Sequence, residues 1–314
     1  MKKLLSYFKQ YFSQGVSMKA HLFLVIFLIF TITINYILDF EDSVLDKYFK
    51  KPSGILYYTL FYYFAYYLIA IPNAWIRKTD YLKKKEFWIK SLLFVGIIGI
   101  MAGFYQYYEI LKLFKQHDEY FFVRKILINA KRIIPYVLLL FVVKLFYDKK
   151  EKGLYGLKLK GTNFSPYFIL LLFVLPLILY ASFQQDFLEA YPRWPYWNAK
   201  ETFGLSRPVM ALIYETFYGL DFLSVELIFR GALVIGMVKI MGKDAILPMV
   251  AVYAFLHFGK PLGERISSVF GGYILGVIAL YSRSILGGFI LHVGVAYMME
   301  IAAYIQHFLM IKNH

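Results

Sequence analysis

The chain has 314 residues, of which 60% are hydrophobic and 20% aromatic, and its mean hydropathy of +0.56 is too high for an ordinary water-soluble domain. It has no cysteine, which excludes a disulfide framework, a thiolate nucleophile and a cysteine-ligated zinc site. Its formal net charge of +15 comes from short basic clusters between apolar segments, a pattern that sets membrane topology, so we expect no nucleic-acid partner.

Apolar segments separated by polar breaks follow one another along the whole chain. They lie near 20–38, 55–73, 87–105, 133–147, 165–183, 208–241, 245–258, 266–283 and 284–310. About 20 apolar residues cross the hydrocarbon core of a bilayer, so we expect an all-α, polytopic transmembrane helical bundle of about eight or nine spans in the lipid bilayer. The segments 133–147 and 245–258 are short, and such segments can instead be buried in protein or re-entrant.

Clusters of lysine and arginine predict the orientation of these spans. They precede the first span, follow the second and follow the fourth: Lys2, Lys3, Lys9 and Lys19; Arg77, Lys78, Lys83, Lys84 and Lys85; Lys149, Lys150, Lys152, Lys158 and Lys160. Because cytoplasmic loops carry such clusters, we expect a cytoplasmic N-terminus. We expect the membrane to be the plasma (inner) membrane of a prokaryote. The acidic segment 39–54 fits the opposite side, whereas the basic segment 106–132 does not.

The distribution of polar residues divides the chain into three regions. Residues 1–183 are expected to form N-terminal transmembrane helices, 184–207 an interfacial loop and 208–310 a second transmembrane domain of catalytic type. The loop contains Trp194 and Trp197, and tryptophan favours the membrane–water boundary. A lid over a substrate is the alternative role for this loop.

Ionisable side chains gather in the apolar segments after residue 208: Glu215, Asp221, Glu226, Arg230, His257, His292 and Glu300. Charges are unfavourable within a membrane, so such residues usually face a protein interior or a watery cavity and indicate a functional site. Glu226 and Arg230 are four residues apart and can pair on one helical face, which Glu215 joins if a single helix continues through it. A buried pair that only fixes helix packing is the alternative.

Two histidines on separate segments, His257 and His292, can exchange protons near neutral pH. With Glu226 they could activate a water molecule directly, or they could hold a divalent metal such as zinc that activates it. The sequence leaves both mechanisms open, so the cofactor is unknown.

The segment between the two histidines contains Ser268, Gly272 and Gly276 at four-residue spacing, which predicts a close contact between helices. Glu264 precedes them at the start of the same span. We expect its carboxylate to stabilise the first turn of that helix, with a place in the site as the alternative.

Three short motifs in these segments resemble those of the CAAX protease and bacteriocin-processing (CPBP, or Abi) family of intramembrane proteases. "VELIFRG", "YAFLH" and "HVGVA" are similar to Glu-Glu-x-x-x-Arg, Phe-x-x-x-His and His-x-x-x-Asn/Asp, in that order, within residues 208–300. The resemblance implies a peptidase whose substrate is a membrane-associated protein or peptide. It also implies that Glu226 and His257 activate water, that Arg230 orients Glu226 and that His292 stabilises the oxyanion.

Three positions depart from the family pattern. Val225 replaces the first glutamate, Tyr253 the phenylalanine and Ala296 the Asn or Asp. Glu226 could act as the base in a shifted arrangement, and Glu300 could partly supply the polar group that Ala296 lacks. The departures keep two alternatives open, namely an inactive relative that acts as a membrane scaffold or immunity factor, and a proton-coupled transporter that uses the same residues. Neither a prenylated substrate nor an oligomeric state is predicted.

Overall fold

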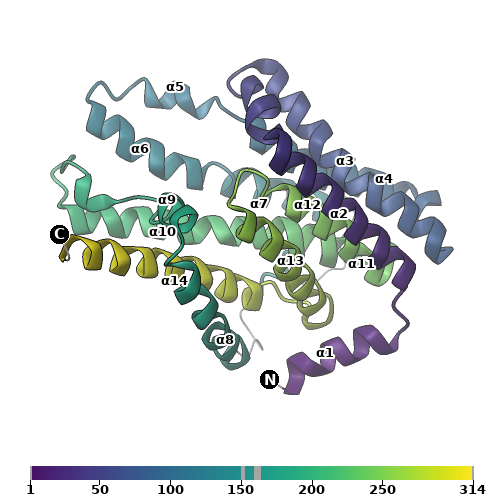
Figure 1. The fold of residues 1–314 in the computed structure, drawn as a ribbon. Helices are drawn as coiled ribbons and strands as arrows, with labels where there is room; N and C mark the ends of the chain where they lie inside the picture. The colour runs from purple at the N-terminus through teal and green to yellow at the C-terminus, as the bar shows by residue number, and fades with distance from the viewer. Residues whose placement is uncertain (1, 150–152, 159–163, 313–314) are drawn as a thin grey trace. The chain divides into compact units, whose positions relative to one another are not determined.

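The computed structural model describes residues 2–149, 153–158 and 164–312, and this part of the chain is mostly helical without a β-strand (Figure 1). Within these residues, six helical segments are long and apolar enough to cross a membrane: Met18–Leu38, Pro52–Arg77, Lys85–Leu111, His117–Phe146, Leu262–Ser282 and Leu286–Leu309. The prediction of an all-α, multi-pass membrane protein is therefore confirmed, whereas the count of eight or nine spans is not. Lys150, Lys152 and Lys160 lie outside the described residues.

The chain forms two compact units, each assembled from segments that are distant in the sequence. The first unit consists of residues 1–105, 134–160 and 225–286, and the second of residues 106–133, 161–224 and 287–314. Each unit therefore combines parts of the N-terminal and C-terminal halves of the chain.

A short apolar helix, α12 (Ile246–Phe255), lies at the centre of the first unit. It packs against α3 (Pro52–Arg77) and α13 (Leu262–Ser282), and α3 lies beside α4 (Lys85–Gly103) (Figure 1). Every residue of α12 is buried. Protein therefore surrounds this helix on all sides, which explains how an apolar segment of only 10 residues is stable without crossing the full hydrocarbon core.

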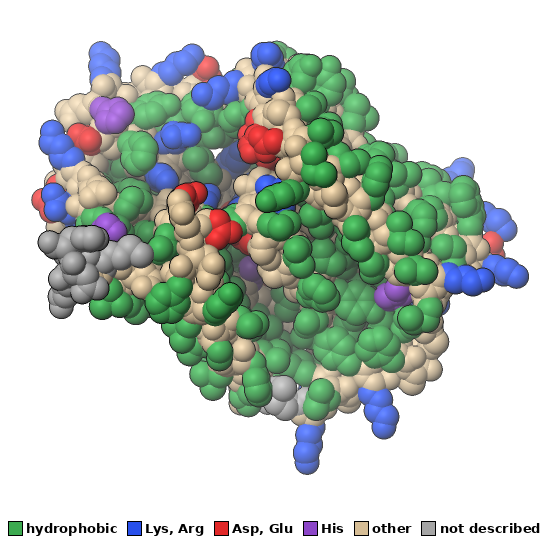
Figure 2. All heavy atoms as spheres, viewed as in Figure 1, with side chains coloured by type: hydrophobic (Ala, Val, Ile, Leu, Met, Phe, Trp, Pro, Cys, Tyr) green, Lys and Arg blue, Asp and Glu red, His purple; other side chains and the backbone are tan. Residues whose placement is uncertain are grey.

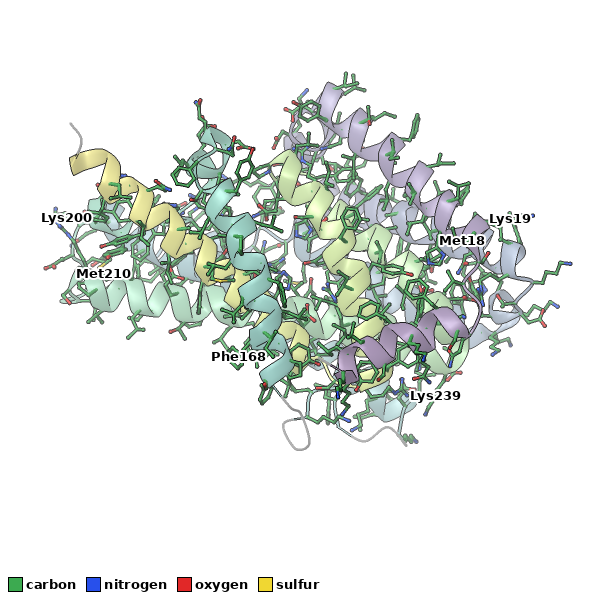
Figure 3. The ribbon with its side chains drawn as sticks, turned by 60° about the horizontal axis from the view of Figure 1, so that its bottom comes forward. Met18, Lys19, Phe168, Lys200, Met210 and Lys239 are labelled. Atoms are coloured by element: carbon green, nitrogen blue, oxygen red, sulfur yellow. The ribbon has the colours of Figure 1, made fainter. Side chains whose placement is uncertain are left out.

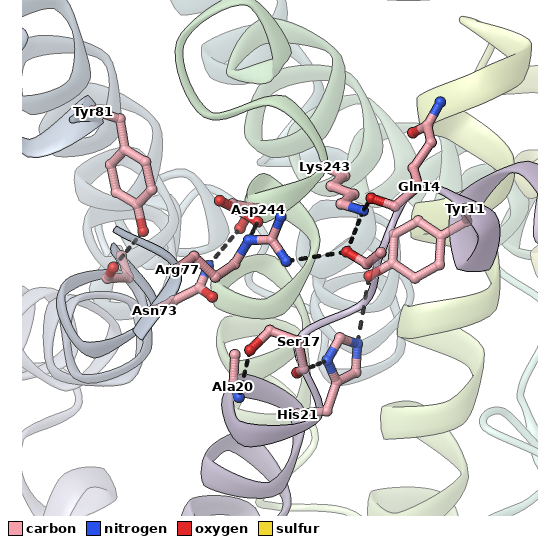
Figure 4. A network of polar contacts seen from close by, with 12 residues as sticks. Tyr11, Gln14, Ser17, Ala20, His21, Asn73, Arg77, Tyr81, Lys243 and Asp244 are labelled. Atoms are coloured by element: carbon pink, nitrogen blue, oxygen red, sulfur yellow. Dashed lines mark hydrogen bonds and ion pairs between the residues drawn. The ribbon is translucent and has the colours of Figure 1, made fainter. Parts of the chain in front are cut away.

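Polar contacts hold one end of the first unit together, where α1 (Lys2–Ser13) turns into α2 (Met18–Leu38) (Figure 4). Lys243 Nζ donates to the backbone carbonyls of Gln14 and Gly15, at 2.6 Å each. Arg77 Nε lies 2.6 Å from Asp244 Oδ1, and its Nη1 donates to the Gly15 carbonyl at 3.4 Å. Arg77 of the second basic cluster therefore contacts the turn between α1 and α2.

The acidic segment lies at the other end of α2, whose 21 residues extend about 31 Å. Asn35 Nδ2 donates to the Phe258 carbonyl at 3.0 Å, and Asn35 Oδ1 accepts from the Glu41 backbone N–H at 2.9 Å. The Glu41 carboxylate also lies against Gly259. The C-terminal end of α12 therefore shares this end of the unit with the acidic segment.

In the second unit, the predicted interfacial loop, residues 184–207, is rich in aromatic residues and is called the aromatic loop below. It folds onto the helices α6 (His117–Ala130), α10 (Arg207–Glu226) and α14 (Leu286–Lys312). Trp194 is buried in a cluster with Phe122, Met210 and Tyr214. Phe187 and Tyr191 pack against Ala303 of α14. These contacts give the predicted interfacial loop a fixed structure.

Apolar side chains cover much of the face shown in Figure 2, as expected of helices that contact lipid. On α8 (Ser165–Ala181), Phe168 points away from the helix axis (Figure 3) and is 56% exposed. Leu172, Phe173 and Leu177 on the same helix are also exposed. These residues would contact acyl chains in a bilayer.

A buried ion pair links α4 to the chain after α7 (Ile133–Phe146). Lys90 Nζ lies 2.7 Å from both carboxylate oxygens of Asp148, and Tyr155 donates its phenol to the same carboxylate at 2.8 Å. The exposed fractions of Lys90 and Asp148 are 1% and 5%. Removing one partner would leave an uncompensated charge in a medium that solvates charges poorly.

We therefore expect Lys90→Met to lower the free energy of unfolding by about 3–5 kcal/mol, measured by denaturation of the detergent-solubilised protein. Lys112→Met is the matched control, because Lys112 and its partner Glu109 are 69% and 67% exposed and such pairs contribute at most about 1 kcal/mol. Equal decreases in the two variants would contradict a stabilising role for the buried pair.

Candidate functional site

The predicted pair of Glu226 and Arg230 is present and completely buried. Glu226 ends α10, and Arg230 lies in the π-helical turns that follow, η5 (Leu227–Gly236). Arg230 Nη1 lies 3.0 Å from Glu226 Oε1, and both residues have exposed fractions of 0%. Helix α10 also continues without a break from Glu215 to Glu226, as the predicted shared face requires. Short π-helical stretches within helices are frequently found at functional sites.

Tyr253 of α12 connects this pair to His257. The Arg230 guanidinium carbon lies 4.3 Å from the centre of the Tyr253 ring, a favourable cation–π distance. The ring centres of Tyr253 and His257 are 4.6 Å apart, and His257 Nδ1 lies 2.8 Å from the Tyr253 carbonyl oxygen. Because a carbonyl only accepts hydrogen bonds, Nδ1 carries the proton. In the neutral ring Nε2 then has the lone pair that a base or metal ligand needs.

His292 belongs to the second unit, where it is partly buried on α14. Its ring centre lies 4.7 Å from that of Phe222, and its charge would interact with the neighbouring carboxylate of Asp221. Asp221 accepts hydrogen bonds from Nε and Nη2 of Arg132, the former at 3.0 Å. Glu226, Arg230 and His257 belong to the first unit. The predicted arrangement of Glu226, His257 and His292 around one water molecule or metal ion therefore stays a prediction.

The Arg132–Asp221 pair was not predicted from the sequence. In the sequence, Arg132 belongs to the basic segment 106–132. Asp221 lies in an apolar segment, where its carboxylate needs a cationic partner. That requirement was the available signal, but it does not say which cation of the chain satisfies it.

The three supporting candidates have separate surroundings. Glu300 accepts hydrogen bonds from the backbone N–H of Arg193, with both carboxylate oxygens, at 2.9 and 3.1 Å. The backbone carbonyl of Glu215 accepts a hydrogen bond from the Tyr297 phenol at 2.8 Å. Glu264 lies in the first turn of α13, as predicted, 3.2 Å from Lys260 Nζ. Glu300 thus holds the aromatic loop, and a role in catalysis for any of the three stays a prediction.

Among the described residues, one group of three acidic or imidazole side chains has metal-compatible geometry. It consists of Glu41, Asp42 and Asp46, whose ligand atoms lie within 4.8 Å of one another. In the sequence, these residues had indicated only the orientation of the membrane spans. Burial, together with the negative charges of Asp46 and Asp42, raises the pKa of Glu41 to about 7.

Known proteins give no match to this chain, whether family models, curated proteins or solved structures are compared. The resemblance to the CAAX protease and bacteriocin-processing family consequently depends on the three short motifs alone.

The predicted small-residue face of α13 makes close contact with α12. A Cβ atom added to Gly272 would lie 2.9 Å from Cδ1 of Tyr253, and one added to Gly276 would lie 2.7 Å from Cε of Met249. The predicted helix contact is confirmed. Gly272 leaves the space that the Tyr253 ring occupies beside Arg230.

We expect Gly272→Ala to lower the free energy of unfolding by about 1–3 kcal/mol, because the new methyl group overlaps the Tyr253 ring. Its neighbour offers a matched control, since a Cβ added to Gly271 meets no atom within 4 Å. Gly271→Ala should be neutral or stabilise the helix by up to about 1 kcal/mol. Denaturation of both variants in detergent measures the difference, and equal stabilities would contradict the close approach at Tyr253.

The raised pKa of Glu41 predicts a pH dependence. The folded protein retains a proton on Glu41 that the unfolded chain releases near pH 4.5, so this contribution to stability is present below pH 4.5 and is lost as the pH rises through about 7. Glu41→Gln should therefore reduce the fall in unfolding free energy between pH 5 and about pH 8. Denaturation at several pH values tests this. Glu109→Gln, at an exposed site, is the control, and identical pH profiles for wild type and Glu41→Gln would contradict the prediction.

Proposed function

We propose that the chain is an intramembrane endopeptidase of CAAX-protease-like type that hydrolyses a peptide bond of a membrane-associated protein or peptide. The observation that carries the proposal is the fully buried Glu226–Arg230 pair. Tyr253 of α12 lies against Arg230, and His257, just after α12, lies against Tyr253. Two full charges are unfavourable inside a membrane protein, and they are most often retained there for function.

Each residue has a role that suits its surroundings. Glu226, with His257, would deprotonate a water molecule for attack on the peptide carbonyl. Arg230 holds the Glu226 carboxylate by the 3.0 Å contact and would orient it toward the water. His292, from the second unit, would donate a hydrogen bond to the oxyanion that forms. If a divalent metal such as zinc takes part, Glu226, His257 and His292 would hold it, and it would polarise the water.

Complete burial of Glu226 sets a condition on this mechanism. Amide hydrolysis consumes water, so the helices around the pair must open to admit both water and an extended peptide. In the helix formed by α10 and η5, the π-helical turns of η5 have a hydrogen-bond pattern that departs from that of a regular α-helix. We propose that the opening occurs there.

The membrane arrangement follows from the same proposal. Among the described residues, α8 and the helix formed by α10 with η5 would join the six long spans to give eight, and α12 would be a buried segment that does not cross. The basic end of the first unit would face the cytoplasm, with the N-terminus on the same side, in the inner membrane of a prokaryote.

An inactive relative that acts as a scaffold or immunity factor is the second candidate. Two observations favour it, namely the replacement of motif residues by Val225 and Ala296 and the complete burial of Glu226. In that case the Glu226–Arg230 pair would fix the packing of the helix against α12.

Cleavage of a quenched-fluorescent peptide library by the reconstituted protein distinguishes these candidates. We expect the wild type to cleave and Glu226→Gln, His257→Ala and His292→Ala each to lower activity by about 100-fold or more, the usual contribution of general acid–base groups. Glu109→Gln should keep full activity. Loss of cleavage with a chelator would indicate a metal.

Folding must be verified for each variant by gel filtration and thermal denaturation, because Glu226→Gln leaves Arg230 buried without its carboxylate. The His292→Ala variant avoids this problem. A folded wild-type protein that cleaves no peptide would contradict the peptidase proposal and favour the scaffold.

A further inference from the structure

A cavity in the second unit has no part in the proposed peptidase chemistry. Its volume is about 480 Å³, and three segments line it. Lys125 comes from α6, and Ala303 and His307 come from α14. The third segment runs from α9 (Gln185–Ala190) through η4 (Tyr196–Asn198) and contributes residues 188–193, Pro195, Trp197 and Asn198.

Contacts that span all three segments fix the wall of the cavity. Lys125 Nζ donates to the Arg193 carbonyl at 2.9 Å, and the Arg193 N–H donates to Glu300. The rings of Trp197 and His307 are stacked, with centres 4.5 Å apart and planes at 24°. A cavity whose backbone and rings are held in this way is pre-formed, which reduces the entropy lost when a ligand binds.

The chemistry of the lining is both cationic and aromatic. Lys125 and Arg193 bring two positive charges, against one carboxylate, Glu189, which accepts a hydrogen bond from Gln185 at 2.9 Å. The ammonium of Lys125 has three N–H donors, of which the bond to the Arg193 carbonyl uses one. Arg193 is exposed, so its planar fork can turn toward an anion.

We propose that this cavity binds the phosphate head group of an anionic membrane lipid. Lysine and arginine are the usual partners of phosphate, and basic cavities between transmembrane helices bind anionic head groups. The aromatic residues Tyr191 and Trp197 place the cavity at head-group depth, because tyrosine and tryptophan favour the membrane–water boundary. A soluble phosphate ester shares the charged group but has no acyl chains to lie along the apolar helices.

Tryptophan fluorescence of the full chain in lipid nanodiscs provides the test. Brominated phosphatidylglycerol quenches tryptophan close to its binding site, and Trp75→Phe with Trp88→Phe leaves Trp194 and Trp197 as the reporters. We expect quenching at lower mole fractions of brominated phosphatidylglycerol than of brominated phosphatidylcholine. Arg193→Gln should weaken this preference about fivefold, and Lys125→Gln with Arg193→Gln should abolish it.

Lys200→Gln is the matched control, because Lys200 is an exposed cation of the aromatic loop that does not line the cavity. It should keep the preference for phosphatidylglycerol. An unchanged preference in Arg193→Gln and in the double variant would overturn the proposal. Displacement of the lipid by millimolar glycerol phosphate would overturn the assignment to a lipid and leave a site for soluble phosphate esters. Peptide cleavage is measured separately, so its failure does not affect this result.

Discussion

Charge compensation inside an apolar medium is the constraint on which the other features depend. Buried or largely buried ion pairs among the described residues satisfy it. They include Lys90 with Asp148, Arg77 with Asp244 and Arg230 with Glu226 in the first unit, and Arg132 with Asp221 in the second. The desolvation of an unpaired ion amounts to several kcal/mol, more than any single packing contact supplies. These pairs therefore restrict which helices can lie beside one another.

The same constraint explains the position of α12. This helix is too short to cross a bilayer alone, and its neighbours α3 and α13 pack against it. Gly272 and Gly276 allow α13 to approach closely, and the space beside Gly272 is filled by the Tyr253 ring. Tyr253 in turn covers the Arg230 guanidinium. Helix packing and the burial of the charged pair are thus parts of one arrangement.

Features that depend on local spacing were predicted from the sequence, and features that depend on distant partners were not. The helical class, the Glu226–Arg230 contact at four residues and the small-residue face of α13 follow from the periodicity of a helix. Lys90 and Asp148 are 58 residues apart, and Arg132 and Asp221 are 89 apart. No periodicity relates such positions, because their contact arises only when the helices pack.

Tyr253 shows why a difference from a motif that a sequence only resembles must be judged by the contacts of the residue. A phenylalanine at this position would keep the ring face that covers Arg230. It would also keep the backbone carbonyl that accepts a hydrogen bond from His257 Nδ1. The single residue therefore fixes two others, the guanidinium through its ring and the imidazole through its carbonyl. Val225 differs, because a valine cannot replace a carboxylate in any such contact. In the proposed mechanism Glu226 is therefore the only carboxylate of the motif left to act as the base. Its contact with Arg230 holds it in place, and its complete burial restricts its access to water.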